Sequence, residues 1–93
     1  MPEVGGFEVL VEVRLRPMVA DPQGATVERA LPALGFEGVH HVRFGKAVRF
    51  EVDAVDEASA RHVALDLADR LLGNPVIEDT EVLWCRRAAV TAR

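Results

Sequence analysis

The side chains that could carry out chemistry are few, and they are scattered along the chain. The one serine, Ser59, falls in the first turn of an expected helix, where a hydroxyl more often supports the helix end than attacks a carbonyl. The one cysteine, Cys85, lies near the end of an expected strand and fits a small packing role better than a reactive one. With a single cysteine, the chain can form no internal disulfide. These residues predict no catalytic nucleophile.

Histidines and acidic residues do not combine into a metal site. His40 and His41 are adjacent, and neighbours on a strand point to opposite faces, so the two cannot bind one metal together. Glu78, Asp79 and Glu81 form an acidic run that a solvated strand entry explains more simply. Glycine-rich phosphate-binding motifs are absent from the sequence. We therefore expect no metal and no cofactor bound by this chain.

The composition argues against nucleic-acid and membrane partners. The 93 residues include 11 basic and 15 acidic side chains, for a net charge of −4, whereas phosphate binding needs a basic surface. The longest apolar stretches are far shorter than the roughly 20 residues that a membrane span requires. The N-terminus lacks the basic and apolar regions of a signal peptide. We expect a cytoplasmic protein without nucleic-acid or membrane partners.

The length predicts one domain over residues 1–93, with an ordered core at about 7–86 and a flexible tail at 87–93. Strict alternation predicts a strand at 7–16 with one buried face. Its apolar set is Phe7, Val9, Val11, Val13 and Leu15.

A helix is expected next, ending at a left-handed Gly35. Its apolar residues have helical spacing: Val27, Ala30, Leu31 and Leu34. Either Asp21 caps it with Pro22 in the first turn, or residues 21–24 form a turn and Thr26 is the cap. Pro32 predicts a kink or a shortened last turn.

The second half predicts two strands, a helix and a last strand. Residues 39–44 and 48–53 are expected as a hairpin with an odd loop or a bulge at 45–46. The helix begins at Asp56 and stops at Gly73 and Pro75. Its expected stripe is Ala60, Val63, Ala64, Leu67 and Leu71. Leu65 and Leu72 lie off that stripe and are either contact residues or part of a wide apolar face. The last strand spans 76–86.

This order predicts an α+β fold: ferredoxin-like β-α-β-β-α-β, an antiparallel sheet with two helices on one face. RNA-recognition modules share this order but stack bases on aromatic side chains of the open face. Here that face offers charged side chains such as Glu8, Arg14 and Arg49 beside Leu10. Such a face suits association with another protein surface.

Three segments together resemble one family, PurS, the small subunit of the multi-subunit phosphoribosylformylglycinamidine synthase of purine biosynthesis. They cover about residues 9–83 in order: residues 13–15 running to Asp21-Pro22-Gln23-Gly24, then Val42-Arg43-Phe44-Gly45-Lys46, then Leu71-Leu72-Gly73-Asn74-Pro75-Val76-Ile77-Glu78-Asp79. Thr80 and Gly73 depart from the residues usual in the family at those positions.

The resemblance implies a noncatalytic subunit that joins a glutaminase, PurQ, to an ATP-using synthetase, PurL, for ammonia transfer. ATP, Mg and glutamine would be used by the assembled complex, and the chain would form a homo-dimer or tetramer. Candidate partner-interface residues are Asp21, Gln23, Arg43, Lys46, Leu65, Leu72, Asn74, Glu78 and Asp79. Asp21 fits best as a turn and cap former. Partner contact and plain solvation are equally good explanations for the other charged residues and the glutamine, namely Gln23, Arg43, Lys46, Glu78 and Asp79.

Two other classes of protein share this topology. An ACT-like regulatory domain would bind a small effector between paired domains, but residues 18–20 lack the glycine expected after the first strand. A small enzyme of acylphosphatase type would need a glycine-rich phosphate cradle, which the sequence lacks. Both alternatives are weaker than the PurS-like reading.

Overall fold

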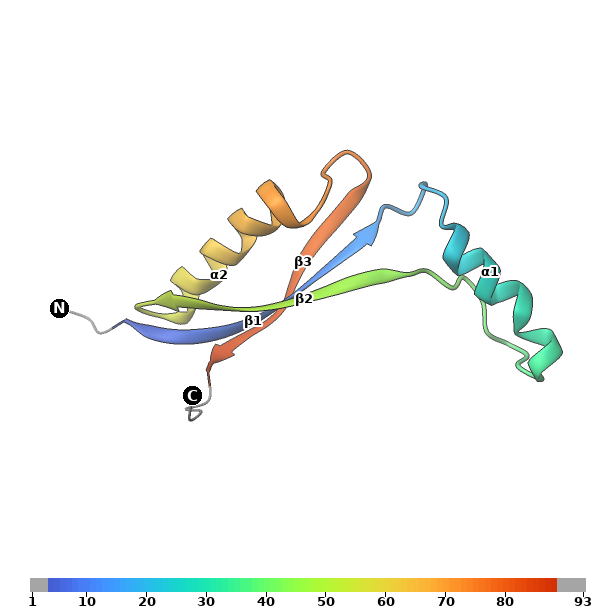
Figure 1. The fold of residues 1–93 in the computed structure, drawn as a ribbon, viewed down its shortest axis with the longest axis horizontal. Helices are drawn as coiled ribbons and strands as arrows, with labels where there is room; N and C mark the ends of the chain where they lie inside the picture. The colour runs from blue at the N-terminus through green and yellow to red at the C-terminus, as the bar shows by residue number, and fades with distance from the viewer. Residues whose placement is uncertain (1–3, 89–93) are drawn as a thin grey trace.

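The computed structural model describes residues 4–88, and their order is strand, helix, strand, helix, strand. Three strands form one antiparallel sheet in the order β2-β1-β3. These strands are β1 (Gly5–Leu15), β2 (Gly45–Ala54) and β3 (Glu78–Arg87). Helix α2 (Glu57–Leu67) lies along one face of the sheet, and helix α1 (Pro22–Ala30) lies beyond its end (Figure 1).

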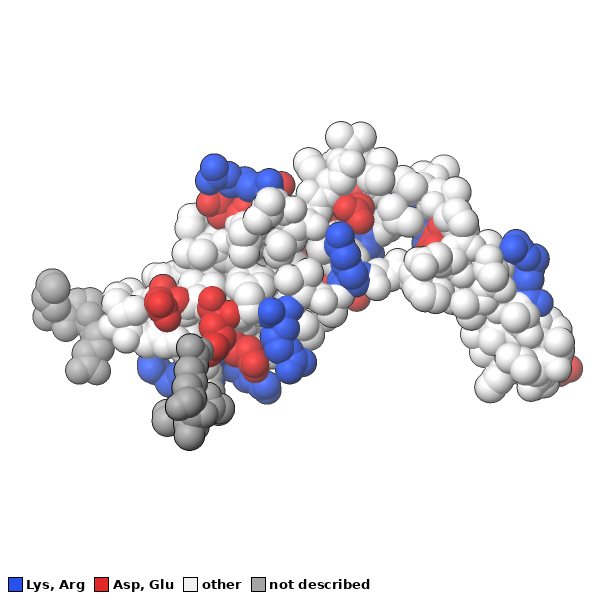
Figure 2. Space-filling view, viewed as in Figure 1, with Lys and Arg blue, Asp and Glu red and all other residues white. Residues whose placement is uncertain are grey.

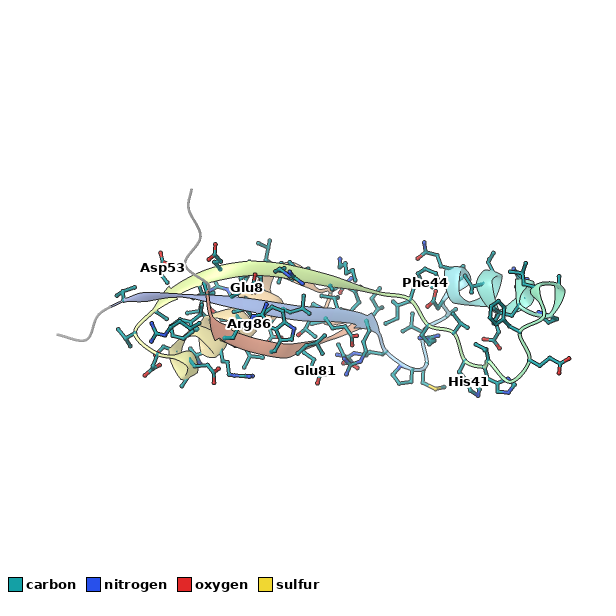
Figure 3. The ribbon with its side chains drawn as sticks, turned by 90° about the horizontal axis from the view of Figure 1, so that it is seen from below. Glu8, His41, Phe44, Asp53, Glu81 and Arg86 are labelled. Atoms are coloured by element: carbon teal, nitrogen blue, oxygen red, sulfur yellow. The ribbon has the colours of Figure 1, made fainter. Side chains whose placement is uncertain are left out.

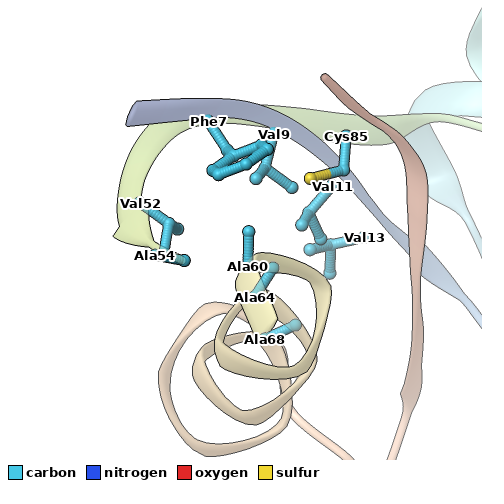
Figure 4. Packing of buried hydrophobic residues seen from close by; sticks show 10 residues of the cluster. All are labelled: Phe7, Val9, Val11, Val13, Val52, Ala54, Ala60, Ala64, Ala68 and Cys85. Carbon is cyan, nitrogen blue, oxygen red and sulfur yellow. The ribbon is translucent and has the colours of Figure 1, made fainter. Parts of the chain in front are cut away.

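Strand β1 is central because its alternating residues supply most of the core. Phe7, Val9, Val11 and Val13 are all buried on the face covered by α2, as the alternation predicted (Figure 4). Cys85 of β3 and Val52 of β2 complete the buried cluster from the flanking strands. The core is therefore one sheet face closed by a single helix.

Helix α2 reaches the sheet through small residues. Asp56 caps it by accepting a hydrogen bond from the Ser59 N–H at 2.8 Å, and a π-helical segment, η2 (Ala68–Leu72), continues it. Ala60, Ala64 and Ala68 are buried, one turn apart, against the valines of β1. The expected stripe was correct at Ala60 and Ala64 but wrong at Val63 and Leu71, which are exposed. Alanine lets the helix axis come closer to the sheet than larger residues would.

The expected strand at 39–44 is not part of the sheet. Residues 39–44 have no strand pairing, and Gly45 and Lys46 are the first residues of β2, paired with Arg14 and Val13. The hairpin prediction was therefore wrong. The chain turns instead at Gly38 and His41, whose φ angles are 80° and 57°.

Helix α1 and the chain around it form an arm, which we define as residues 17–44. Asp21 is the N-cap and Pro22 the first helical residue, so the first of the two expected starts is correct. A 3₁₀ turn, η1 (Pro32–Leu34), replaces the helix at Pro32, and Gly35 ends it with φ of 85°. Only α2 covers the sheet face, which differs from the expectation that both helices would do so.

The arm gives the molecule an elongated shape. The radius of gyration is 17.5 Å and the principal extents are 59 × 32 × 21 Å. A compact chain of this length would have a radius of gyration of about 12 Å. The α+β class and the antiparallel sheet are confirmed, with one helix on the sheet and one outside it.

Strand β3 contains a bulge. Leu10 pairs with Trp84 and Val11 with Val82, so Leu83 is the extra residue. Val82 faces the core and Trp84 the open face, as the bulge requires. Arg87 is the last residue of β3; the rest of the expected flexible tail, from residue 89, lies outside the described residues.

Candidate functional site

Seven of the nine predicted interface residues surround the place where the arm leaves the sheet. A cleft of about 240 Å³ is lined by Asp21, Gln23, Lys46 and Glu78, among others. A second cleft of about 680 Å³, lined in part by Asp21, Arg43 and Asp79, lies between arm and sheet. Asn74 is hydrogen-bonded to Glu78 beside them. We call this region the junction.

Asp21 is the only buried charged side chain among residues 4–88, at 8% exposed. One carboxylate oxygen accepts a hydrogen bond from the Gly24 N–H at 2.9 Å, which caps α1. The other accepts from the Phe44 N–H at 2.6 Å, in the chain that returns from the arm. These two bonds, with the nearby Arg43 charge, lower the pKa of the Asp21 carboxyl below its ordinary value. Its position indicates a structural bridge.

Arg43 closes the other side of the junction. Its guanidinium donates to the carbonyl of Arg16 at 3.0 Å and to that of Val19 at 2.8 Å. Glu28 of α1 accepts from the Val42 N–H at 3.0 Å. One nitrogen of the Arg43 guanidinium therefore binds the backbone of this chain, while the residue as a whole stays exposed.

The loop after η2 is held by its own polar groups. The Asn74 N–H donates to the Glu78 carboxylate at 2.7 Å, and the Val76 N–H donates to the Asn74 side-chain oxygen at 3.0 Å. Arg16 donates from its backbone N–H to the carbonyl of Ile77 and from its guanidinium to that of Pro75. An ion pair of 3.4 Å joins Arg16 to Asp79. The loop presents Val76, which is 78% exposed.

The other predicted residues differ in position. Gln23 and Lys46 are exposed at the rim of the junction. Leu65 is exposed on the outer side of α2, while Leu72 is half-buried and packs against the core. The structure therefore does not bring these two leucines to the junction.

Sequence reasoning missed the apolar surface of the arm. Leu34 is 70% exposed and Phe36 55% exposed, and Val39 and Phe44 are also exposed. Figure 2 shows few charged side chains on this face of the arm, whereas both signs of charge gather over the sheet. The sequence pattern assigned Leu34 to a helix and Val39 and Phe44 to a strand, so their exposure could not be predicted. Only Phe36, between Gly35 and Gly38, fell outside the expected elements.

The open face of the sheet is polar, with one aromatic residue near its centre. Figure 3 views the molecule from this side and labels Glu8 and Arg86, which form an ion pair of 2.8 Å. Two guanidiniums lie near the Trp84 ring, with the Arg86 carbon 4.3 Å and the Arg49 carbon 5.6 Å from the ring centroid. Tryptophan and arginine in this arrangement are typical of protein contact surfaces.

The residues that could do chemistry are not assembled. Within residues 4–88, no group of three or more His, Cys, Asp or Glu side chains could hold a metal ion. Cys85 is buried, which raises the pKa of its thiol. In the same part of the chain no helix is long and apolar enough to cross a membrane. Fold and site together define a small α+β interaction module with an exposed apolar arm.

Comparison with known proteins identifies the family. Residues 8–85 match PurS, described as phosphoribosylformylglycinamidine (FGAM) synthase, and the chain belongs to this family. The PurS subunit of Synechocystis is 44% identical over 73 residues, which are 78% of this chain and 73% of that protein. The PurS subunit of Thermotoga maritima is 36% identical, over 82% of this chain and 93% of that one.

Solved structures agree with the family. Thermus thermophilus PurS has a TM-score of 0.81 and 28% identity, covering 90% of this chain and 99% of that chain. A chain in the structure of PurLQS from Thermotoga maritima has a TM-score of 0.76 and 32% identity, covering 89% and 98%. The ACT-like alternative has no support from these matches.

Proposed function

We propose that this chain is the noncatalytic subunit that joins a PurL-type synthetase to a PurQ-type glutaminase in FGAM synthase. The observation that carries the proposal is the family match over residues 8–85. The related chain in the PurLQS structure of Thermotoga maritima supports the choice of partners.

The chemistry explains why such a subunit is useful. The assembled enzyme converts formylglycinamide ribonucleotide, glutamine, ATP and water into formylglycinamidine ribonucleotide, glutamate, ADP and phosphate. Ammonia released from glutamine is lost to water and protonation unless the two active sites are held together. A subunit that fixes both partners raises the effective concentration of ammonia without reacting itself. ATP, Mg and glutamine belong to the partners in this scheme.

We also propose that the chain forms a homo-dimer or tetramer and acts in the cytoplasm. The elongated shape and the exposed apolar residues of the arm support self-association, because a single copy leaves them in water. One cysteine without a disulfide partner fits a reducing compartment.

Reconstitution tests the joining role. Cognate PurL and PurQ are assayed for FGAM formation with and without this chain, using either glutamine or ammonium chloride as the nitrogen source. We expect the chain to be required with glutamine and dispensable with ammonium, since free ammonia bypasses the transfer. Equal glutamine-dependent turnover without the chain would show that it does not join the two enzymes.

A further inference from the structure

The arm is positioned with little help from apolar packing. Among the described elements, α1 packs closely only against η1, whereas α2 packs against all three strands. The buried apolar cluster lies between the sheet and α2 and contains no residue of the arm. Something other than a hydrophobic core must set the direction of the arm.

Polar side chains replace a strand partner for the returning chain. The N–H groups of Val42 and Phe44 point to carboxylates of Glu28 and Asp21, at 3.0 and 2.6 Å. Between them, the Arg43 side chain binds two carbonyls of the outgoing chain. The N–H groups of Val42 and Phe44 are therefore hydrogen-bonded without joining the sheet, which lets this extended segment lie outside it.

The contact at the base of α1 is close. A Cβ at Gly24 would lie 2.1 Å from the carbonyl oxygen of Val42, so the returning chain passes directly against the first turn of the helix. Asp21 precedes this turn. One of its carboxylate oxygens accepts from an N–H of the helix, and the other accepts from an N–H of the returning segment. A carboxylate can accept both bonds at once, whereas an amide has one acceptor oxygen and its NH₂ group would face a donor.

We propose that Asp21, Glu28 and Arg43 form a polar hinge lock. It ties the outgoing and returning segments of the arm together next to the end of β1 and the start of β2, and so fixes the orientation of the arm relative to the sheet in the free chain. Asp21 is its central positioning residue, because it alone joins the start of α1 to the returning chain through both oxygens of one side chain. The inference goes beyond the proposed function and does not depend on it, since it concerns the protein before any partner binds.

One substitution separates capping from bridging. Asparagine is as good an N-cap as aspartate, so Asp21→Asn keeps the bond to Gly24 and loses the one to Phe44. Asp56→Asn is the matched control, because Asp56 caps α2 by the same kind of bond and lies at no hinge. Arg43→Met removes the second part of the lock while keeping an unbranched side chain.

Two measurements on the full-length chain test the lock. Backbone amide exchange by NMR should show the Phe44 N–H exchanging about tenfold faster or more in Asp21→Asn, with the Gly24 N–H unchanged. Electron spin resonance then measures the distance between labels on Glu37→Cys, at the exposed end of the arm, and Asp53→Cys, at the exposed end of β2. Cys85→Ala serves as background, and excess unlabelled chain removes distances between copies.

We expect the distance distribution to broaden in Asp21→Asn and in Arg43→Met. In Asp56→Asn it should be the same as in the parent chain. Circular dichroism should report the same helix content in both asparagine variants, which separates a loosened arm from an unfolded one. An unchanged distribution in both Asp21→Asn and Arg43→Met would overturn the proposal. So would equal broadening in Asp56→Asn.

Discussion

Gly24 has less room for a side chain than a residue on an exposed helix would normally have. Replacing glycine by alanine within a helix usually stabilises it by about 1 kcal/mol. At Gly24 a Cβ would meet the carbonyl of Val42 at 2.1 Å, so we expect Gly24→Ala to destabilise α1 by about 1–3 kcal/mol instead. Native-state amide exchange over residues 22–30 measures this change in the stability of α1.

Thr26→Ala on the same helix is the control for Gly24→Ala. Thr26 is exposed. Its replacement should change the stability of α1, as measured by amide exchange, by no more than about 0.5 kcal/mol. Greater protection of α1 in Gly24→Ala would mean that the returning chain moves aside at no cost.

Asp56 predicts a pH dependence of stability. Hydrogen bonds from the Ser59 N–H and hydroxyl lower the pKa of the Asp56 carboxyl. A lowered folded-state pKa adds stability that is complete above the ordinary carboxyl pKa of about 3.9 and is lost as pH falls through the folded value. The unfolding free energy of the wild type minus that of Asp56→Asn should therefore be constant between about pH 7 and 5 and should decrease below that range. Urea denaturation at each pH measures this, and a difference that grows on acidification would contradict it.

At the scale of the elements, the close contact between α2 and β1 depends on alanine. Ala64 is fully buried against the valines of β1, so Ala64→Leu should overpack the core and lower the free energy of unfolding by about 1–3 kcal/mol. Leu65→Ala, one residue along and 47% exposed, should change it by no more than about 0.5 kcal/mol. Urea denaturation compares the two, and a larger effect at Leu65 would show that the helix presents a different face to the sheet.

The elements also show which sequence patterns were informative. The alternation in β1 predicted its buried face because every second residue of a central strand meets the core. Residues 39–44 carry similar strand-forming residues, but the N–H groups of Val42 and Phe44 bind Glu28 and Asp21 instead of a strand. A local pattern cannot reveal carboxylates supplied by residues 14 and 23 positions earlier.

For the whole molecule, the arm should matter for association and little for folding. Leu34 and Phe36 are 70% and 55% exposed, so Leu34→Ser and Phe36→Ser should leave the unfolding free energy of the isolated chain within about 0.5 kcal/mol. If the arm is covered in the assembled enzyme, each change should weaken association about tenfold or more. Sedimentation equilibrium measures self-association, and co-purification with PurL and PurQ measures assembly.

Leu71→Ser is the matched control for these arm variants. Leu71 is 74% exposed but lies in η2, away from the arm. If Leu71→Ser and Phe36→Ser weaken association equally, the loss comes from making any exposed apolar position polar and not from the arm itself. Association kept in both arm variants would show that the arm is not an interface.

The sequence by itself determined the family, the alternating core strand and the Asp56 cap of α2, because each depends on residue types at short, fixed spacing. Only the tertiary structure decided that α1 leaves the sheet, that residues 39–44 stay unpaired and that seven scattered polar residues meet at the junction. These features depend on contacts between residues distant in the chain, where Asp21 meets Phe44 and Arg43 meets Arg16. No local pattern encodes such a contact, since the partner is chosen by the path of the whole chain.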